Sequence, residues 1–221
     1  HSNIKSVEQP IIELLAPTLP HYTVGVDSIL NPIITKANGA PRELGYNEPV
    51  ISSKFDFNDA ASYNIQGIDV DQGLSSSYIM DMIEDSRGNL WFATWTAGVT
   101  MYNGRTFIQF DENKGLSSNY IWAIHEDKKG NIWFGTDGSG VTAYNGHTFT
   151  EYDTEDGLAS DLVLDIAEDE DGNIWFATGE GISMFDGESF TTYGAEQGMS
   201  GEYVYSIVID FEGKVWCGIA G

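Results

Sequence analysis

Cysteines, prolines and basic residues are scarce in this chain, and their scarcity excludes several classes of structure and partner. The one cysteine, Cys217, leaves no intrachain disulfide and no cysteine-based zinc site. Lysine and arginine total 10 against 34 aspartates and glutamates, which gives a net charge of −24. Nucleic acids and anionic lipid surfaces both require basic patches, so this charge argues against either as a partner. No apolar run reaches the roughly 18 residues that would insert into a membrane.

Hydrophobic and aromatic residues are plentiful instead. They make up 41% and 13% of the 221 residues, enough apolar surface to fold a globular core despite the acidity. The chain has 25 glycines, and its six prolines all precede residue 50. A composition so rich in turn-forming residues favours many short strands over long helices.

A repeat of about 42 residues begins near residue 73. A Gly-Leu-Ser-Ser motif recurs, with small variations, at spacings of 42, 42 and 41 residues. The leading glycines are Gly73, Gly115, Gly157 and Gly198. Eighteen residues after each of them stands a tryptophan, at Trp91, Trp133, Trp175 and Trp216. The first three units continue into a Tyr-Asn-Gly or Phe-Asp-Gly hairpin signal, and the fourth stops before it.

Each unit predicts four short antiparallel strands. In the second unit they are expected at 120–125, 132–136, 140–144 and 148–152, because these runs are rich in β-branched and aromatic residues and are separated by turn signals. Four strands with this period are typical of a β-propeller blade. The predicted fold is therefore all-β, a β-propeller at 54–221 whose last blade is incomplete, preceded by an extended, proline-spaced segment at 1–53.

Two architectures fit the ends of the repeat. Residues 54–57 and 63–69 stand where the third and fourth strands of a preceding blade are expected. In one architecture these strands complete the blade begun by 203–218 and close a four-bladed ring. In the other the chain is a fragment, with more blades after Gly221. The missing third strand of the last unit favours the fragment.

The repeat resembles a known family. The segments Gly-Leu-Ser-Ser-Asn-Tyr at 115–120, Glu-Asp-Lys-Lys-Gly-Asn-Ile-Trp-Phe-Gly-Thr at 126–136 and Gly-Val-Thr-Ala-Tyr-Asn-Gly at 140–146 are similar to the two-component regulator propeller repeat. The resemblance covers about residues 73–221. It implies a propeller from the extracytoplasmic sensor region of a hybrid histidine kinase, or from a related surface protein, in the periplasm or on the outer surface of a Gram-negative bacterium. In that family such repeats are associated with glycan sensing.

A second resemblance is weaker. The Asp-x-x-Gly-Asn-Ile-Trp-Phe stretch is also similar to streptogramin lyase propellers, but residues 136–140 depart from their pattern. We therefore expect no enzymatic activity, no catalytic residues and no cofactor, with a lyase-like enzyme as the less favoured alternative.

Several conspicuous residues have structural explanations. The repeated tryptophans are expected to pack between neighbouring blades, and Cys217 aligns with phenylalanines and is expected to be a small buried hydrophobe. The Asp169-Glu170-Asp171-Gly172-Asn173 stretch resembles the start of a calcium loop. Its counterparts carry basic residues, so we interpret it as an Asx-type turn and expect no metal site.

Positions that break the repeat are better candidates for function, since function usually lies in loops built on a shared scaffold. They precede the first strand, begin it, or lie between the second and third strands. Met80, Leu162, Leu164 and Tyr205 are such residues, at repeat positions that begin or precede the first strand. The candidate ligand-binding residues are Tyr78, Trp95, Tyr120, Trp122, Asp137, Glu180 and Tyr203. Exposed aromatic rings beside carboxylates are suited to stack on sugar rings and to bind their hydroxyl groups.

The sequence thus predicts a non-enzymatic propeller for sensing or recognition, with an oligosaccharide or other small ligand as its partner. The alternative is a scaffold subunit of a cell-surface or periplasmic complex, which would bind protein partners through the propeller face or the N-terminal segment.

Overall fold

The computed structural model of the chain describes residues 22–24, 33–39, 41–43, 50–51, 68–199 and 203–220. Their regular elements are β-strands, apart from three short 3-10 helices. We number the repeats as units 1 to 4 in chain order. Unit 1 contains β5 (Ile79–Glu84), β6 (Leu90–Thr94), β7 (Val99–Tyr102) and β8 (Thr106–Phe110). Unit 2 contains β9 (Ile121–Glu126), β10 (Ile132–Thr136), β11 (Val141–Tyr144) and β12 (Thr148–Tyr152). Unit 3 contains β13 (Val163–Glu168), β14 (Ile174–Thr178), β15 (Gly181–Phe185) and β16 (Ser189–Tyr193), and unit 4 contains β17 (Val204–Ile209) and β18 (Val215–Ile219).

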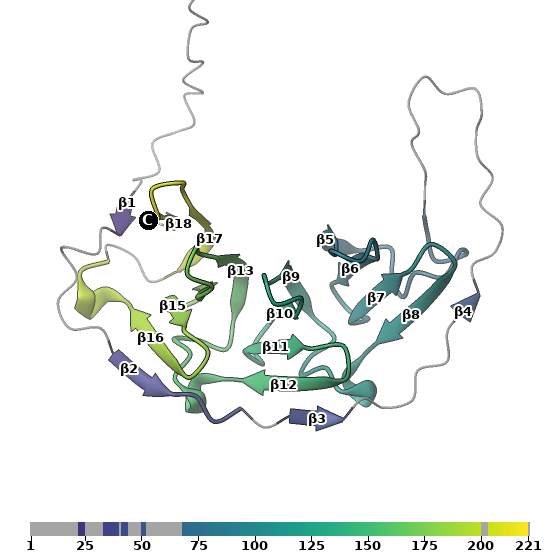
Figure 1. The fold of residues 1–221 in the computed structure, drawn as a ribbon, viewed down its shortest axis with the longest axis horizontal. Helices are drawn as coiled ribbons and strands as arrows, with labels where there is room; N and C mark the ends of the chain where they lie inside the picture. Colours follow the sequence, from purple (N-terminus) through teal and green to yellow (C-terminus); the bar gives the residue numbers. More distant parts are fainter. Residues whose placement is uncertain are drawn as a thin grey trace, which may run out of the picture.

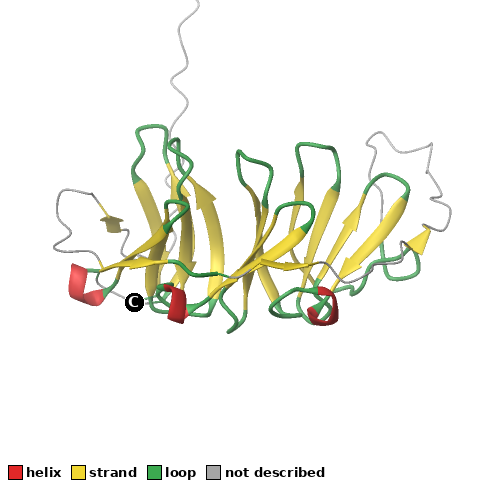
Figure 2. Cartoon of the chain, turned by 60° about the horizontal axis from the view of Figure 1, so that its bottom comes forward, coloured by secondary structure: helices red, strands yellow, loops and turns green. Residues whose placement is uncertain are grey.

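Within each unit, consecutive strands pair antiparallel with their neighbours. The four sheets lie side by side along an open arc, with units 1 and 4 at its two ends (Figure 1). This arrangement confirms the predicted all-β class and the propeller-like repeat. The 3-10 helices η1 (Glu112–Lys114), η2 (Thr154–Asp156) and η3 (Ala195–Gln197) each lead from one unit to the next, and all three lie on the same side of the molecule (Figure 2).

An aspartate organises the turn between the first and second strands of each unit. In unit 2, Asp127 Oδ1 accepts hydrogen bonds from the backbone N–H groups of Lys129 and Asn131, at 3.0 and 2.8 Å. Its Oδ2 accepts from the Asn131 amide at 2.7 Å and from the Trp133 indole at 2.9 Å. Gly130 completes the turn at a φ of 82°, a conformation that favours glycine. The structure therefore confirms the turn interpretation of this motif.

The resemblance to a calcium loop in unit 3 has the same explanation. Both carboxylate oxygens of Asp169 accept hydrogen bonds from Asn173, and Oδ2 also accepts from the Trp175 indole. No group of three or more histidine, cysteine or acidic side chains arranged for a metal occurs among the residues that the structure describes.

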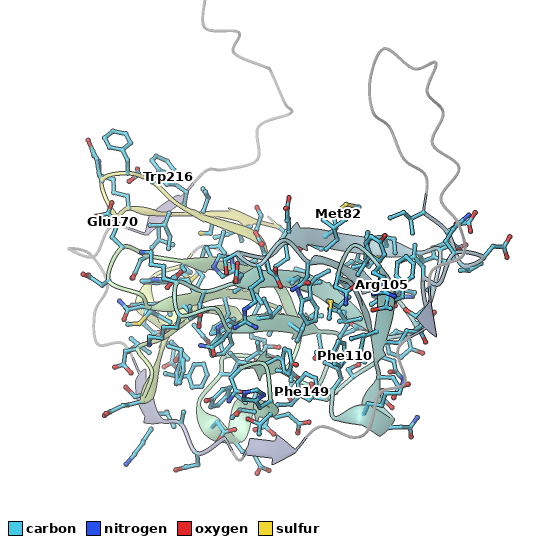
Figure 3. All side chains as sticks on the ribbon, turned by 45° about the vertical axis from the view of Figure 1, so that its right-hand side comes forward. Met82, Arg105, Phe110, Phe149, Glu170 and Trp216 are labelled. Atoms are coloured by element: carbon cyan, nitrogen blue, oxygen red, sulfur yellow. The ribbon has the colours of Figure 1, made fainter. Side chains whose placement is uncertain are left out.

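The hydrophobic core lies between neighbouring units. Trp91 of unit 1 contacts Phe134 and Tyr144 of unit 2 with its ring, and Trp133 contacts Phe176 and Phe185 of unit 3 in the same way. Figure 3 shows two further core phenylalanines, Phe110 and Phe149. Burial of a large apolar side chain contributes about 1.5–3 kcal/mol. The predicted inter-blade packing of the tryptophans is confirmed for units 1 and 2, and Cys217 is buried as expected.

Trp216 in unit 4 differs from these two tryptophans, because 39% of its surface is exposed at the end of the arc. It projects outward in Figure 3. Val208 and Tyr205 on the adjacent strand are also exposed. Unit 4 therefore presents an open apolar face where units 1 and 2 each carry a neighbour.

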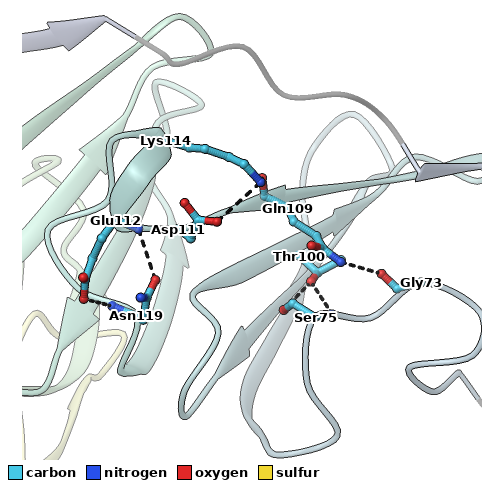
Figure 4. A network of polar contacts seen from close by, with 8 residues as sticks. All are labelled: Gly73, Ser75, Thr100, Gln109, Asp111, Glu112, Lys114 and Asn119. Carbon is cyan, nitrogen blue, oxygen red and sulfur yellow. Dashed lines mark hydrogen bonds and ion pairs between the residues drawn. The ribbon is translucent and has the colours of Figure 1, made fainter.

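Polar contacts hold the connection between units 1 and 2 (Figure 4). The Glu112 backbone donates to Asn119 Oδ1 at 3.1 Å, and the Asn119 backbone donates to Glu112 Oε1 at 3.0 Å. Lys114 Nζ donates to the Gln109 carbonyl and lies 3.5 Å from the Asp111 carboxylate. These contacts fix the loop that carries the residues preceding β9.

Short strands from the N-terminal segment pair along the outer edges of the units in reverse order (Figure 1). β4 (Val50–Ile51), β3 (Pro41–Glu43) and β2 (Ile33–Lys36) each add a fifth strand to units 1, 2 and 3, respectively. β1 (Tyr22–Val24) pairs with β18, in the place that a third strand occupies in the other units. The sequence predicts none of these four strands. The closing strands that it predicts at 54–57 and 63–69 lie outside the described residues, except for residues 68 and 69, which form no strand.

Candidate recognition site

The two ends of each unit carry different connections. The turn between the second and third strands lies at the same end as the residues that precede the first strand, because consecutive strands are antiparallel. The 3-10 helices belong to this end, which we call the helix face (Figure 2). The aspartate turns and the hairpins between the third and fourth strands lie at the opposite end, the turn face. All of the sequence-predicted site residues belong to connections or strand starts at the helix face.

An aromatic cluster forms at the boundary between units 1 and 2. The Trp95 ring lies 5.5 Å from the Tyr120 ring and 4.7 Å from the Trp122 ring, in edge-to-face orientations of 77° and 66°. Edge-to-face contacts are a favourable geometry for aromatic pairs. Tyr120 is 43% exposed and the two tryptophans are half-buried, so the cluster is anchored in the protein and still open to solvent.

Asp137 places a carboxylate beside this cluster. Its Oδ1 accepts a hydrogen bond of 3.4 Å from Trp122 Nε1, and its backbone N–H donates to the Tyr120 carbonyl at 3.0 Å. The next unit supports the same turn, since Asp161 accepts backbone hydrogen bonds from Gly138 and Gly140. The backbone of the turn is thus held from two sides, and the exposed carboxylate lies next to the Trp122 ring.

A β-bulge sets the position of Trp122. The pairing of β9 with β10 passes from Ala123 to Ile121 and skips Trp122. The residue at the same position is skipped in every unit, and these residues are Met80, Trp122, Leu164 and Tyr205. Bulges commonly re-aim a side chain next to a functional site. The recurring bulge therefore gives each unit one variable side chain at the helix face.

The structure brings Trp95, Tyr120, Trp122 and Asp137 together. Tyr78 adjoins Trp95, whereas Glu180 and Tyr203 lie in units 3 and 4. Tyr78 is 71% exposed and is joined to Trp95 by a hydrogen bond between its carbonyl and the Trp95 backbone N–H. Glu180 is exposed in the corresponding turn of unit 3. Tyr203 packs instead against Tyr205, with the ring centroids 4.8 Å apart.

Two half-buried aspartates on the first strands were not anticipated from the sequence. Asp165 Oδ2 accepts the Ile207 backbone N–H at 2.9 Å, and Asp81 Oδ2 accepts the Ile124 N–H at 2.8 Å, so each aspartate links its unit to the next. Burial raises the pKa of Asp165 despite these hydrogen bonds. Burial likewise lowers the pKa of His125, although nearby carboxylates act in the opposite direction. The two aspartates therefore connect neighbouring units through these hydrogen bonds.

Stacking and hydrogen bonding are the chemistry that the aromatic cluster offers. Three rings with different orientations provide apolar surface, and Asp137 provides a hydrogen-bond acceptor at their edge. Such a combination binds a ligand with apolar C–H faces and donor hydroxyl groups. No helix among the described residues is long and apolar enough to cross a membrane.

Comparisons with known proteins agree with the repeat. Residues 73–96, 115–138 and 157–180 match the family described as the two component regulator propeller. The three matches begin at the leading glycines of units 1 to 3 and reach the turns that follow their second strands. No curated protein sequence matches the chain.

Several solved structures have a similar fold. The extracellular domain of a putative hybrid two component system from B. thetaiotaomicron has a TM-score of 0.60 and 20% identity, over 92% of this chain and 31% of that one. The extracellular domain of a putative one component system from the same organism has a TM-score of 0.56 and 23% identity, over 67% and 23%. A streptogramin B lyase structure has a TM-score of 0.55 and 17% identity, over 86% and 67%.

These identities establish a common fold and do not transfer an activity. The chain spans about a quarter to a third of the two sensor-system domains that it resembles. Each family match covers the first half of unit 1, 2 or 3, including its first and second strands. Three of the four units of this chain thus match the two component regulator propeller family, each over its first two strands.

Proposed function

We propose that this propeller is the recognition part of an extracytoplasmic protein and that it binds a neutral oligosaccharide at the aromatic cluster of units 1 and 2. The proposal depends chiefly on one observation, the convergence of Trp95, Tyr120 and Trp122 beside the Asp137 carboxylate. The net charge of −24 favours a neutral or cationic ligand over an anionic one.

The extracytoplasmic location is supported by the two sensor-system structures, which are described as extracellular domains. The absence of an enzymatic role is supported by the repeat family and by the character of the cluster, which combines rings with a single carboxylate. A lyase activity would require a convergent acid and base at the same face, and turnover of a streptogramin by the purified chain would contradict our proposal.

The test is binding of the purified chain to a panel of neutral oligosaccharides, measured by glycan array and then by calorimetry. Trp122→Ala should weaken binding by at least about tenfold, because a stacked ring supplies roughly 1–3 kcal/mol. Phe211→Ala is the matched control, since Phe211 is 89% exposed and lies at the turn face. Binding by neither array nor calorimetry, or equal binding by Trp122→Ala, would overturn the proposal.

A protein scaffold is the second candidate function, and the open apolar face of unit 4 favours it. Trp216 and Val208 are exposed on this face, where burial against a partner would be favourable. Limited proteolysis of the chain alone and in a purified complex tests this function. Protection of unit 4, which carries this face, in the complex only would support the scaffold, and identical cleavage in both would oppose it.

A further inference from the structure

A cavity of about 220 Å³ opens at the turn face between units 2 and 3. Its unit 2 side is formed by the aspartate turn, Trp133 and the β11–β12 hairpin. Its unit 3 side is formed by β14, β15 and their turns. This cavity lies at the opposite end of the units from the aromatic cluster, and no residue of the candidate recognition site lines it.

The equivalent groove between units 1 and 2 is much smaller, at about 80 Å³. The repeat explains the difference. In unit 1, Met101 pairs across the sheet with Trp91 on one side and with Ile108 on the other, and both Met101 and Ile108 pack on the core. Their side chains fill the space beside the tryptophan.

In unit 2 the same two positions hold smaller residues. Ala143 pairs with Trp133 on one side and with Thr150 on the other. Alanine and threonine leave open the space that methionine and isoleucine fill in unit 1, because a methionine side chain has three more heavy atoms than an alanine. The cavity therefore results from residues specific to unit 2 and is not a general property of the scaffold.

The walls of the cavity combine aromatic and polar groups. Trp133 stacks on Tyr152, with centroids 6.0 Å apart and 20° between the planes, and the Phe185 ring meets Trp133 edge-on at 5.8 Å. Thr150, Lys129 and Asn131 add a hydroxyl, an ammonium and an amide to the lining. Aromatic walls with a few convergent polar groups are typical of small-molecule sites.

Charge and size restrict the ligand further. The Asp127 carboxylate in the lining is engaged by four hydrogen bonds within its own turn, so the ligand meets mainly neutral donors and acceptors. The volume lies just below the roughly 300 Å³ at which ordinary small-molecule pockets begin, which suits one ring and excludes an extended chain. A strongly acidic protein also disfavours an anion.

We propose that the groove between units 2 and 3 is a second binding site, for a neutral polyhydroxylated molecule the size of a single sugar ring. Ala143 and Thr150 make room for the ring, Trp133 and Tyr152 supply its apolar wall, and Asn131 with Lys129 binds its hydroxyl groups. The site goes beyond the oligosaccharide recognition proposed for the helix face and does not depend on it.

The probes for this site are D-glucose, D-galactose and N-acetyl-D-glucosamine at millimolar concentrations, followed by NMR shifts of the Asn131 and Asn145 side-chain amides. At least one sugar should shift these amides saturably. Ala143→Met, which introduces the residue found at this position in unit 1, should weaken the binding of that sugar by at least about tenfold. Met101→Ala is the matched control, because it changes the groove between units 1 and 2 and should leave the dissociation constant within about twofold.

A second variant guards against misfolding of the first. Thr150→Val keeps the volume of the side chain and removes its hydroxyl. It should weaken the binding of the sugar by about threefold to tenfold. Trp122→Ala should leave these shifts unchanged, so failure of the helix-face proposal is distinguishable from failure of this one. The absence of any saturable amide shift, or an unchanged affinity in both Ala143→Met and Thr150→Val, would overturn the proposal.

Discussion

Trp91 donates its indole N–H to the Asp85 carboxylate at 2.8 Å, and the same pair recurs in all four units. The aspartate closes the turn at one end of the second strand, and the tryptophan extends from that strand to the next unit. One side-chain pair thereby couples a local turn to the packing between units. Loss of this hydrogen bond should weaken the turn as well as the inter-unit contact.

The first prediction concerns the pH dependence of this pair. Burial raises the pKa of Asp169, but hydrogen bonds from Trp175 and Asn173 outweigh it, and the pKa lies below its ordinary value of 3.8. A carboxyl with a lowered folded-state pKa stabilises the protein above its ordinary pKa, and this stability is lost as the pH falls through the folded-state value. Trp175→Phe removes one donor and should raise the pKa of Asp169 toward 3.8. Carboxyl ¹³C NMR titration measures the shift, and the acid unfolding midpoint should move to higher pH.

Trp122→Phe is the control for that experiment, since the Trp122 indole donates to Asp137 at the helix face and not to an aspartate at the turn face. It should leave the Asp169 titration unchanged. An Asp169 pKa that does not move in Trp175→Phe would show that the indole N–H has no part in lowering it.

The second prediction concerns a link between units 1 and 2. Glu126 accepts hydrogen bonds from both the backbone N–H and the hydroxyl of Ser86, each at 2.7 Å. Glu126→Ala should lower the free energy of unfolding by about 1 kcal/mol. Hydrogen bonds to a carboxylate are stronger than those between neutral groups, but exposure to solvent weakens these two. Glu84 is the repeat counterpart of Glu126 in unit 1, where no earlier unit is described. Glu84→Ala should cost less, and urea unfolding of both variants makes the comparison; equal losses would contradict the link.

The third prediction uses two glycines with similar backbone conformations and different surroundings. Gly140 and Gly104 have φ values of 67° and 85°, so alanine is strained at both, by about 1–2 kcal/mol. At Gly140 an added Cβ would also collide with the Tyr152 carbonyl, whereas nothing lies near Gly104. Gly140→Ala should therefore lower the melting temperature clearly more than Gly104→Ala, as measured by circular dichroism. Equal melting temperatures would show that the turn relaxes freely.

The fourth prediction tests the core between units. Phe149 is fully buried and its ring lies 5.8 Å from that of Phe110. Phe149→Ala should lower the free energy of unfolding by about 3–5 kcal/mol, through lost burial and the cavity left behind. Phe211→Ala at the exposed turn should change it by less than about 0.5 kcal/mol. Chemical denaturation measures both, and a small loss in Phe149→Ala would contradict the packing described here.

Strands and turns of the repeat were predictable because their causes are local. The strand expected at 132–136 is β10, and the aspartate turn before it follows from Asp, Gly and Asn at fixed spacing. The same local signals placed Trp95 and Asp137 in turns at one end of their units. The sequence named these residues among seven candidates, but it did not predict which of the seven lie together.

The parts that escaped prediction depend on partners far away in the chain. The bulge at Trp122 is a property of how β9 pairs with β10, and no residue type signals it. The short strands of the N-terminal segment carry no periodic pattern, since two to four residues are too few to show one. The exchange of Met101 and Ile108 for Ala143 and Thr150 is visible once the units are aligned, but its effect on volume requires the packing.

The reverse order of the edge strands also sets an order of assembly. Val50 pairs with Phe107, 57 positions later, whereas Thr35 pairs with Phe190, 155 positions later. These pairings enclose one another like nested loops, and the entropy of closing a loop grows with its length. On the ribosome the residues of β2 emerge long before those of β16. β2 therefore stays without its partner strand until most of the units have been synthesised. The short edge strands are therefore synthesised before the units, but they can pair only after the units have been made.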